Sequence, residues 1–263
     1  MSGISRPLLA VAVLLAPLVA HSQEPLASVG TPRGFELGIL ASTYHYEEPN
    51  LMELDGERVG ISAAYTFVTH TRWFARIDFR YSHGELRYEG SGVLEDVPDD
   101  LYELRFVEGK DFFPSTRVSL SPYAGLGYRY LYNDLRGTSS TGAIGYRRYS
   151  RYSYIPLGLT SRFGLSERNA IAATVEYDLF LSGQQKSYLS DTNLGYINAT
   201  NRQDSGYGYR VSVVFDVGRF SVGPWLHYWD IDDSDVVSIG GGFSGLEPKN
   251  WTREFGLEMK YRF

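Results

Sequence analysis

One short stretch near the C-terminus combines residue types that suit acid–base chemistry. It reads WLHYWDIDD and places the imidazole of His227 a few residues before the carboxylates of Asp230 and Asp232. A histidine close to carboxylates is the usual material of general acid–base catalysis. The competing interpretation is a belt of aromatic side chains beside a solvated acidic loop. The candidate rim or lumen site consists of Trp225, His227, Trp229, Asp230 and Asp232.

The rest of the chain completes no catalytic set. We find no nucleophile elbow, no Ser–His–Asp order, no phosphate-binding loop and no zinc-ligand spacing. We therefore assign no catalytic residue, no metal site and no cofactor, and we expect a protein that is not an enzyme. Two acidic segments, residues 47–57 and 89–100, offer carboxylates that could bind Ca²⁺ or bridge divalent ions to lipopolysaccharide. Their spacing matches no EF-hand loop, and a solvated surface is the favoured interpretation.

A period-two pattern indicates the elements that must position these residues. In the C-terminal stretch, apolar side chains occupy each odd position from Phe255 to Phe263, and glycine or charged residues occupy the even positions. Neighbouring side chains on a strand point to opposite faces, so the pattern predicts a strand with one apolar face. Ten such segments follow along the chain: residues 35–46, 58–67, 72–83, 101–110, 118–131, 151–163, 170–182, 207–217, 220–231 and 251–263.

The connections between these segments alternate between long and short. Long polar connections are expected at residues 47–57, 89–100, 133–150, 183–205 and 232–250, and short ones at 68–71, 111–117, 164–169 and 218–219. This alternation is typical of a transmembrane barrel, which has short periplasmic turns and longer outer loops. The sequence thus predicts an all-β fold, a ten-stranded antiparallel transmembrane β-barrel. Eight or twelve strands are the alternatives, since the fourth segment has the weakest pattern.

The N-terminus indicates export. Residues 1–22 have a basic start, a short apolar run and small residues before the expected cleavage point, as in a secretory signal peptide. Residues 23–33 are then a short, loose periplasmic leader, and residues 34–263 form the barrel. The chain has no cysteine, a formal net charge of −6, 21 Tyr, 14 Phe and 4 Trp. The acidic balance argues against nucleic acid as a partner, and abundant tyrosine suits membrane–water interfaces.

Strand parity places many charged side chains inside the barrel. The predicted lumen charge network consists of Arg76, Asp78, Arg80, Glu103, Arg105, Arg129, Glu176, Asp178, Arg210, Glu254 and Glu258. The same parity adds Arg162, Lys260, Arg262, Glu36 and Asp216, which makes the two signs equal in number. A balanced set favours ion pairs that link the wall of a filled barrel over a narrow selective pore.

The end of the chain resembles the β-signal of bacterial outer-membrane β-barrel proteins. The residues that carry the resemblance are Gly256, Met259, Tyr261 and the terminal Phe263. The resemblance implies insertion into the outer membrane by the barrel-assembly machinery, with lipid and lipopolysaccharide as surroundings. The chain is also similar in strand number to the omptin surface proteases, which use aspartates and an Asp–His pair at the outer rim. Their motifs lie on other strands and do not occur in order here.

Together these observations predict an integral outer-membrane barrel without enzymatic activity. Its expected role is envelope structure, surface binding or narrow, porin-like passage of a small solute. The alternative is an omptin-like rim hydrolase that uses His227 with Asp230 or Asp232.

Changing the terminal residue separates assembly from stability. Phe263→Ala removes about 1–3 kcal/mol of transfer free energy from the folded barrel, but it removes the recognition feature entirely if the β-signal is read. We expect poor outer-membrane insertion in cells and normal refolding into detergent, measured by fractionation and by heat-modifiable gel migration. Normal insertion in cells would contradict the β-signal interpretation.

Overall fold

The computed structural model of the chain describes residues 24–263, so the predicted signal peptide lies outside the described residues. Ten long strands form its wall: β1 (Gly34–Glu48), β2 (Met52–Val68), β3 (Trp73–Gly90), β4 (Gly92–Lys110), β6 (Val118–Asp134), β7 (Arg147–Gly164), β8 (Asn169–Ser187), β10 (Gly206–Val217), β11 (Phe220–Ile231) and β14 (Asn250–Arg262). The shorter elements are η1 (Ala27–Val29), β5 (Phe112–Ser115), η2 (Leu189–Thr192), β9 (Ala199–Gln203), β12 (Val237–Gly240) and β13 (Phe243–Gly245). Both helical elements in this part of the chain are short 3-10 turns, and none of its helices is long and apolar enough to cross a membrane.

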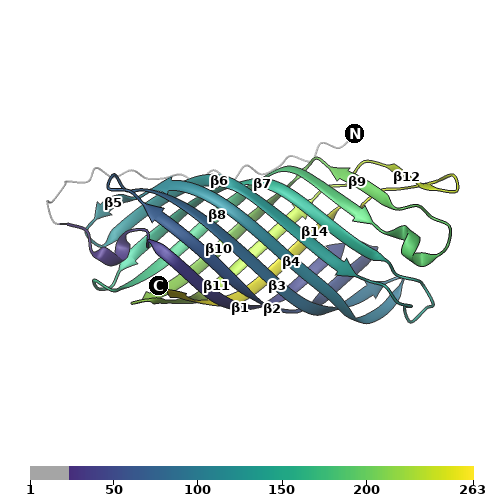
Figure 1. Cartoon of the computed structure of the whole chain (residues 1–263), viewed down its shortest axis with the longest axis horizontal. Helices are drawn as coiled ribbons and strands as arrows, with labels where there is room; N and C mark the ends of the chain where they lie inside the picture. The colour runs from purple at the N-terminus through teal and green to yellow at the C-terminus, as the bar shows by residue number, and fades with distance from the viewer. Residues whose placement is uncertain (1–23) are drawn as a thin grey trace.

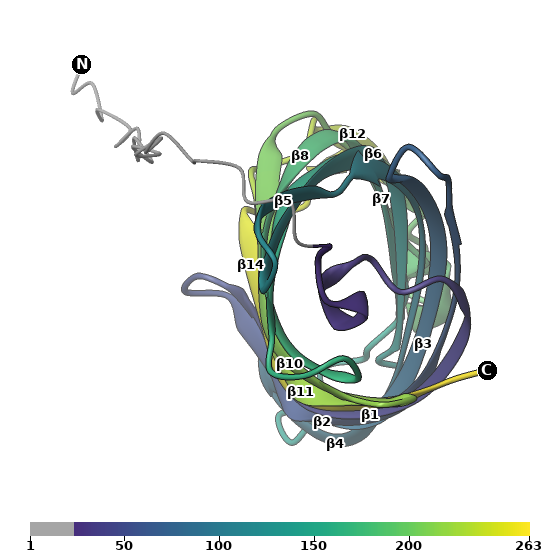
Figure 2. The same cartoon turned by 90° about the vertical axis from the view of Figure 1, so that its left-hand side faces the viewer.

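The strands form a barrel, which Figure 1 shows from the side, and they close into the ring that Figure 2 shows from one end. Each long strand pairs antiparallel with its neighbour along the chain, β10 pairs with β8, and β14 pairs with β1. The β1–β14 ladder runs from the pair Glu36 and Arg262 to the pair Glu47 and Trp251. The prediction of a closed ten-stranded antiparallel barrel is confirmed, and the fourth segment is a complete strand, β4. Closure leaves no wall strand with an unpaired edge.

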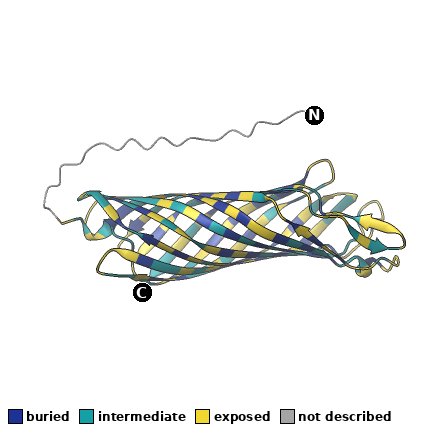
Figure 3. Cartoon of the chain, turned by 90° about the horizontal axis from the view of Figure 1, so that it is seen from above, coloured by how far each residue is buried: buried dark blue, intermediate teal, exposed yellow. Residues whose placement is uncertain are grey.

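Apolar side chains cover the outside of the barrel and charged side chains are buried inside it. Ile39, Val59 and Leu126 are each more than half exposed, whereas Glu103, Asp178 and other charged side chains of the lumen are almost fully buried. Exposed and buried residues alternate along the strands (Figure 3). This is the reverse of a water-soluble domain and matches the period-two pattern of the sequence.

Two of the five predicted long connections are not loops. Strands β1 and β2 continue to a turn at residues 49–51, and β3 and β4 are separated by Ser91 alone. The prediction of polar loops at residues 47–57 and 89–100 was therefore wrong. Both faces of these strand ends are polar or mixed, so the period-two signal fades although the backbone pairing continues. Residues 135–146, 188–205 and 232–249 remain long connections at the same end.

Residues 24–33 of the N-terminal leader lie at the opposite end of the barrel, at the short turns. Residues 26–31, here called the plug, include η1, and Figure 2 shows this segment within the ring. Val29 is completely buried, and its carbonyl oxygen accepts a hydrogen bond from Ser119 Oγ at 2.5 Å. Thr31 N donates to Asp111 Oδ2 at 2.8 Å. Groups in the turns and at the strand ends supply the donor and acceptor for these two contacts. The leader, expected to be loose, is therefore held against the wall at residues 29 and 31.

Large aromatic side chains in the lumen lie against glycines on the neighbouring strand. Tyr154 stands directly opposite Gly127, and Trp225 directly opposite Gly256. A Cβ built on Gly256 would come within 2.6 Å of the Trp225 ring, and one built on Gly127 would overlap the Tyr154 ring. Because glycine has no side chain, these positions leave the space that the aromatic rings occupy.

This close approach predicts the effect of adding one methyl group. Gly127→Ala should displace the Tyr154 ring and lower the free energy of unfolding by about 1–3 kcal/mol, the usual cost of overpacking. Urea unfolding in detergent, followed by heat-modifiable migration, measures the change. Gly30→Ala is the control, because its Cβ would meet nothing closer than 3.9 Å. Equal stability of the two variants would show that the ring can move freely.

Candidate functional site

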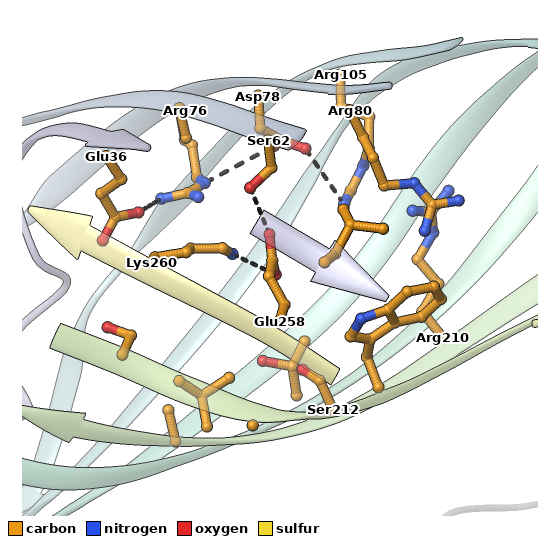
Figure 4. A pocket seen from close by; sticks show the side chains of 18 of the residues that line it. Glu36, Ser62, Arg76, Asp78, Arg80, Arg105, Arg210, Ser212, Glu258 and Lys260 are labelled. Atoms are coloured by element: carbon orange, nitrogen blue, oxygen red, sulfur yellow. Dashed lines mark hydrogen bonds and ion pairs between the residues drawn. The ribbon is translucent and has the colours of Figure 1, made fainter. Parts of the chain in front are cut away.

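The charged side chains of the lumen are arranged in successive layers, beginning at the short-turn end. Glu36 accepts hydrogen bonds from Arg76 Nη1 and Arg262 Nη2, both at 2.8 Å. Next to it, Glu258 pairs with Lys260 Nζ at 2.8 Å and accepts from Ser62 Oγ at 2.5 Å (Figure 4). Glu36 of β1 thus joins β3 and β14, and Glu258 of β14 joins Lys260 of its own strand to Ser62 of β2, so this layer links four strands of the wall.

The middle layer is centred on Arg210. Its guanidinium lies 2.8 Å from Glu103 Oε2 and 3.0 Å from both Glu176 Oε1 and Asp178 Oδ2. Arg105 also pairs with Glu176. All of these groups are buried or nearly buried, and buried charges are tolerated only when paired with good geometry.

The third layer lies toward the end with the long loops. Arg80 Nη2 donates to Glu254 Oε2 at 2.8 Å, and the fully buried Arg58 pairs with Asp99. Arg58 also lies over the Tyr44 ring at 3.4 Å. Arg129 differs from its neighbours, since it contacts the Trp229 ring at 5.6 Å and, among the described residues, has no carboxylate at ion-pair distance.

A chamber of about 250 Å³ lies between the first two layers. Its lining includes Arg76, Arg105 and Lys260, which are labelled in Figure 4. Arg162 and Glu176 also line it. The Nε and Nη1 atoms of Arg162 have no protein partner within the described part of the chain. The chamber is therefore polar, and it lies next to the plug, since Pro32 also lines it.

Beside the middle and third ionic layers, buried aromatic side chains pack together in the lumen. This aromatic barrier consists of Tyr44, Tyr152, Tyr154, Phe180 and Trp229. The ring centroids of Tyr154 and Trp229 are 5.0 Å apart, and those of Tyr152 and Phe180 are 5.6 Å apart. Leucines and Ile231 fill the space around the rings. Barrels of this size are usually filled by their own side chains.

Hydrogen bonds of Glu247 fasten the loop between β11 and β14, residues 232–249, to the wall at the end with the long connections. Arg148 Nη2 lies 2.7 Å from Glu48 Oε1 and also pairs with Glu247 of the loop. Tyr46 OH donates to Glu48 at 2.8 Å. Within the loop, Glu247 N donates to Ser234 Oγ at 2.7 Å. The loop is thus tied to the opposite wall by one shared arginine.

The candidate rim site divides between the two faces of β11. Trp225, His227 and Trp229 point into the lumen, whereas Asp230 lies on the outer face, where Lys249 Nζ pairs with it at 2.8 Å. Asp232 follows the strand and accepts from Ser205 Oγ at 2.6 Å. Residues an odd number apart on a strand face opposite sides, so the structure does not bring His227 and Asp230 together.

The residues of the proposed assembly signal lie on β14 and at its end. Gly256 faces the lumen opposite Trp225, whereas Met259, Tyr261 and Phe263 lie on the outer face. The Phe263 ring is 5.0 Å from Tyr261 and 5.8 Å from Phe35. Recognition by an assembly machinery stays a prediction.

Strand parity predicts an inward position for the main charged residues but misses several of their partners. The members of the predicted lumen charge network face the lumen, and all except Arg129 have an ion-pair partner there. The missed residues are Glu48, Arg58, Asp99, Arg148 and Glu247. Extending the alternation of β2 to Arg58 and of β4 to Asp99 would have predicted that both side chains face the lumen. Nothing in the sequence signals that Glu247 of a loop meets Arg148.

Comparisons with known proteins identify the fold. The sequence matches no protein-family profile and no curated protein. The outer membrane protease OmpT from Escherichia coli has a similar structure, with a TM-score of 0.58 and 12% identity, covering 89% of this chain and 98% of that chain. Neisserial surface protein A has a TM-score of 0.39 and 12% identity, covering 88% of this chain and 97% of that chain. Ail of Yersinia pestis has a TM-score of 0.36 and 13% identity, covering 88% of this chain and 100% of that chain. The fold is that of outer-membrane β-barrels.

The contact of the loop with the wall should depend on pH. Burial raises the pKa of the Glu247 carboxyl from 4.5 to about 7, although Arg148 opposes the rise. Because the folded-state pKa lies above the unfolded value, this group stabilises the loop fully below pH 4.5, and the contribution is lost as pH rises through about 7. Hydrogen exchange of residues 232–249, corrected for its intrinsic pH dependence, should show less protection above pH 7.

Glu247→Gln tests the origin of this pH dependence, because the amide keeps its hydrogen-bonding atoms but does not titrate. The variant should retain loop protection across the pH range. Glu57→Gln, at an exposed position of β2, is the matched control and should behave as the wild type does. A wild-type pH profile that persists in Glu247→Gln would assign the titration to another group.

Proposed function

We propose that this chain is an integral protein of the bacterial outer membrane that has no enzymatic activity and no permanently open pore. Two observations support the proposal: the aromatic barrier of buried side chains inside the barrel, and the plug, whose Val29 is buried at the end with the short turns. We infer that together they close the lumen. A barrel that is closed in this way acts through its wall and its outer loops.

The outer wall supports membrane insertion. Aromatic rings contact one another around the barrel in a row from Tyr81 through Tyr102 and Tyr130 to Tyr149. A second row runs from Tyr177 through Tyr207 and Tyr228 to Trp251. We interpret these rows as the aromatic girdle at the outer membrane–water interface, where amphipathic rings are most stable. Residues 1–22 would direct export and be cleaved, and Phe263 would serve assembly.

The outer loops support a structural or surface-binding role. Ile197 N donates to the carbonyl oxygen of Ile239 at 2.9 Å, which joins the two longest loops. Together these loops expose several large apolar side chains: Leu194, Ile197, Val236 and Phe243. Exposed apolar groups on a water-facing surface are typical of sites that bind partners. Lipid and lipopolysaccharide would surround the wall below them.

The hydrolase alternative has less support. OmpT is a protease, but the likeness at 12% identity concerns the fold alone. Among the described residues, His227 is the only histidine that lines the lumen chamber, and β11 separates it from Asp230 by the thickness of the strand. His227 stands directly opposite Arg210 on β10 and Glu254 on β14, and Glu254 is already bonded to Arg80. We therefore favour the non-enzymatic role.

Planar-bilayer conductance tests the closed lumen. The wild-type barrel should give no stable channels, because side chains of the aromatic barrier fill the path. Deletion of the plug alone should also remain silent. Deletion of the plug combined with Trp229→Ala should give small, unstable openings, whereas the same deletion with Trp251→Ala, on the outer face, should not. Stable wild-type channels would overturn the proposal, and heat-modifiable migration checks that each variant has folded.

A further inference from the structure

We propose that the outer end of the β1–β2 hairpin binds a divalent metal ion of the zinc type through His45, Glu53 and Asp55. One ring nitrogen of His45 and one carboxylate oxygen from each of Glu53 and Asp55 lie within 4.8 Å of one another. Zinc accepts imidazole nitrogen and carboxylate oxygen at about 2.0–2.2 Å, so small rotations of the side chains bring these three atoms to bonding distance.

The register of the hairpin creates this arrangement. His45 stands directly opposite Asp55, and Glu47 directly opposite Glu53. Residues two apart on a strand share a face, so all four side chains point outward from the barrel on one side of the two-stranded ribbon. A sequence search for metal spacing misses the site, because its ligands come from both sides of a turn and are matched by pairing.

The environment of His45 favours a fixed ligand. Its Nδ1 lies 2.6 Å from Asp55 Oδ1, and its Nε2 lies 3.5 Å from Glu47 Oε2. The Trp251 ring, 4.6 Å away, restrains the imidazole from the side. A metal on the nitrogen that faces Asp55 would replace the proton of that hydrogen bond, and Glu47 would hold the other N–H. Metal-bound histidines commonly have such a carboxylate on the second nitrogen.

A row of opposed carboxylates on the same face of the sheet also favours a bound cation. Glu47, Glu53 and Glu89 form a row of directly opposed carboxylates across β1, β2 and β3. Like charges in direct cross-strand positions destabilise a sheet. Arg87 binds Glu89 and Glu95, and no basic side chain in the described chain lies at ion-pair distance from Glu53. A divalent ion at Glu53 would relieve this repulsion, and the imidazole favours zinc over calcium or magnesium.

The neighbouring hairpin provides a matched control. On the outer face of β3 and β4, His83 Nδ1 lies 3.0 Å from Asp100 Oδ1, which also accepts from Tyr81 OH at 2.8 Å. This pair repeats the His–Asp contact but has no second carboxylate opposite, since Glu85 faces Pro98. It should therefore bind zinc far more weakly than the site on the β1–β2 hairpin.

Calorimetric titration of the tag-free mature barrel in detergent with ZnCl₂ tests the proposal. We expect one equivalent to bind, His45→Ala and Asp55→Asn each to weaken binding by about tenfold or more, and His83→Ala to leave it unchanged. Zinc should also raise the urea midpoint of the wild type but not of His45→Ala, because an ion that binds the folded hairpin stabilises it.

Three outcomes would overturn the proposal. Zinc binding that is unchanged in His45→Ala, or lost equally in His83→Ala, would show that these histidines offer only general surface affinity. Calcium binding as tight as zinc binding, with no effect of His45→Ala, would identify a diffuse acidic surface. Circular dichroism and heat-modifiable migration confirm that each variant is folded before titration.

Discussion

The closing ladder between β1 and β14 is the interaction on which the rest of the structure depends. Hydrocarbon offers no partner for a backbone N–H or C=O group, so a sheet that crosses it must leave no edge. The pairing of Gly38 with Lys260 and of its neighbours completes the ring. Once the ring is closed, the alternation along each strand sets the direction of every side chain. Apolar side chains then face outward, and the charged side chains inside the barrel need partners there.

The lumen shows how that second requirement is met. Each layer shares its charges among several strands, as Arg210 does with Glu103, Glu176 and Asp178. Such sharing satisfies the buried groups and holds the wall in one cross-sectional shape. The aromatic barrier then packs beside the ion pairs, while a chamber of about 250 Å³ remains between the first two layers. The lumen that we propose to be closed therefore reflects barrel size and charge balance together, and the plug lies at its other end.

The sequence predicted the wall well and the ends poorly, for physical reasons. Period-two alternation exists because one face meets lipid, so it located the strands, the lumen charges and the inward direction of His227. Outside the lipid both faces meet water, and the pattern no longer marks strands, which hid the upper parts of β1 to β4. Contacts such as Arg148 with Glu247 depend on loop conformation. Parity alone, however, would have separated His227 from Asp230.

The fit of aromatic rings against glycines has a consequence for how neighbouring strands choose their alignment. A shift of the register by one residue would turn every side chain to the wrong face. A shift by two residues keeps both faces correct, so the apolar pattern does not exclude it. A ring that needs a glycine directly opposite does exclude that shift. Between β6 and β7, Tyr123 of β6 lies on Gly158, and Tyr154 of β7 lies on Gly127. Each of the two strands thus supplies one ring and one glycine, and the two ring–glycine contacts specify the same register between β6 and β7.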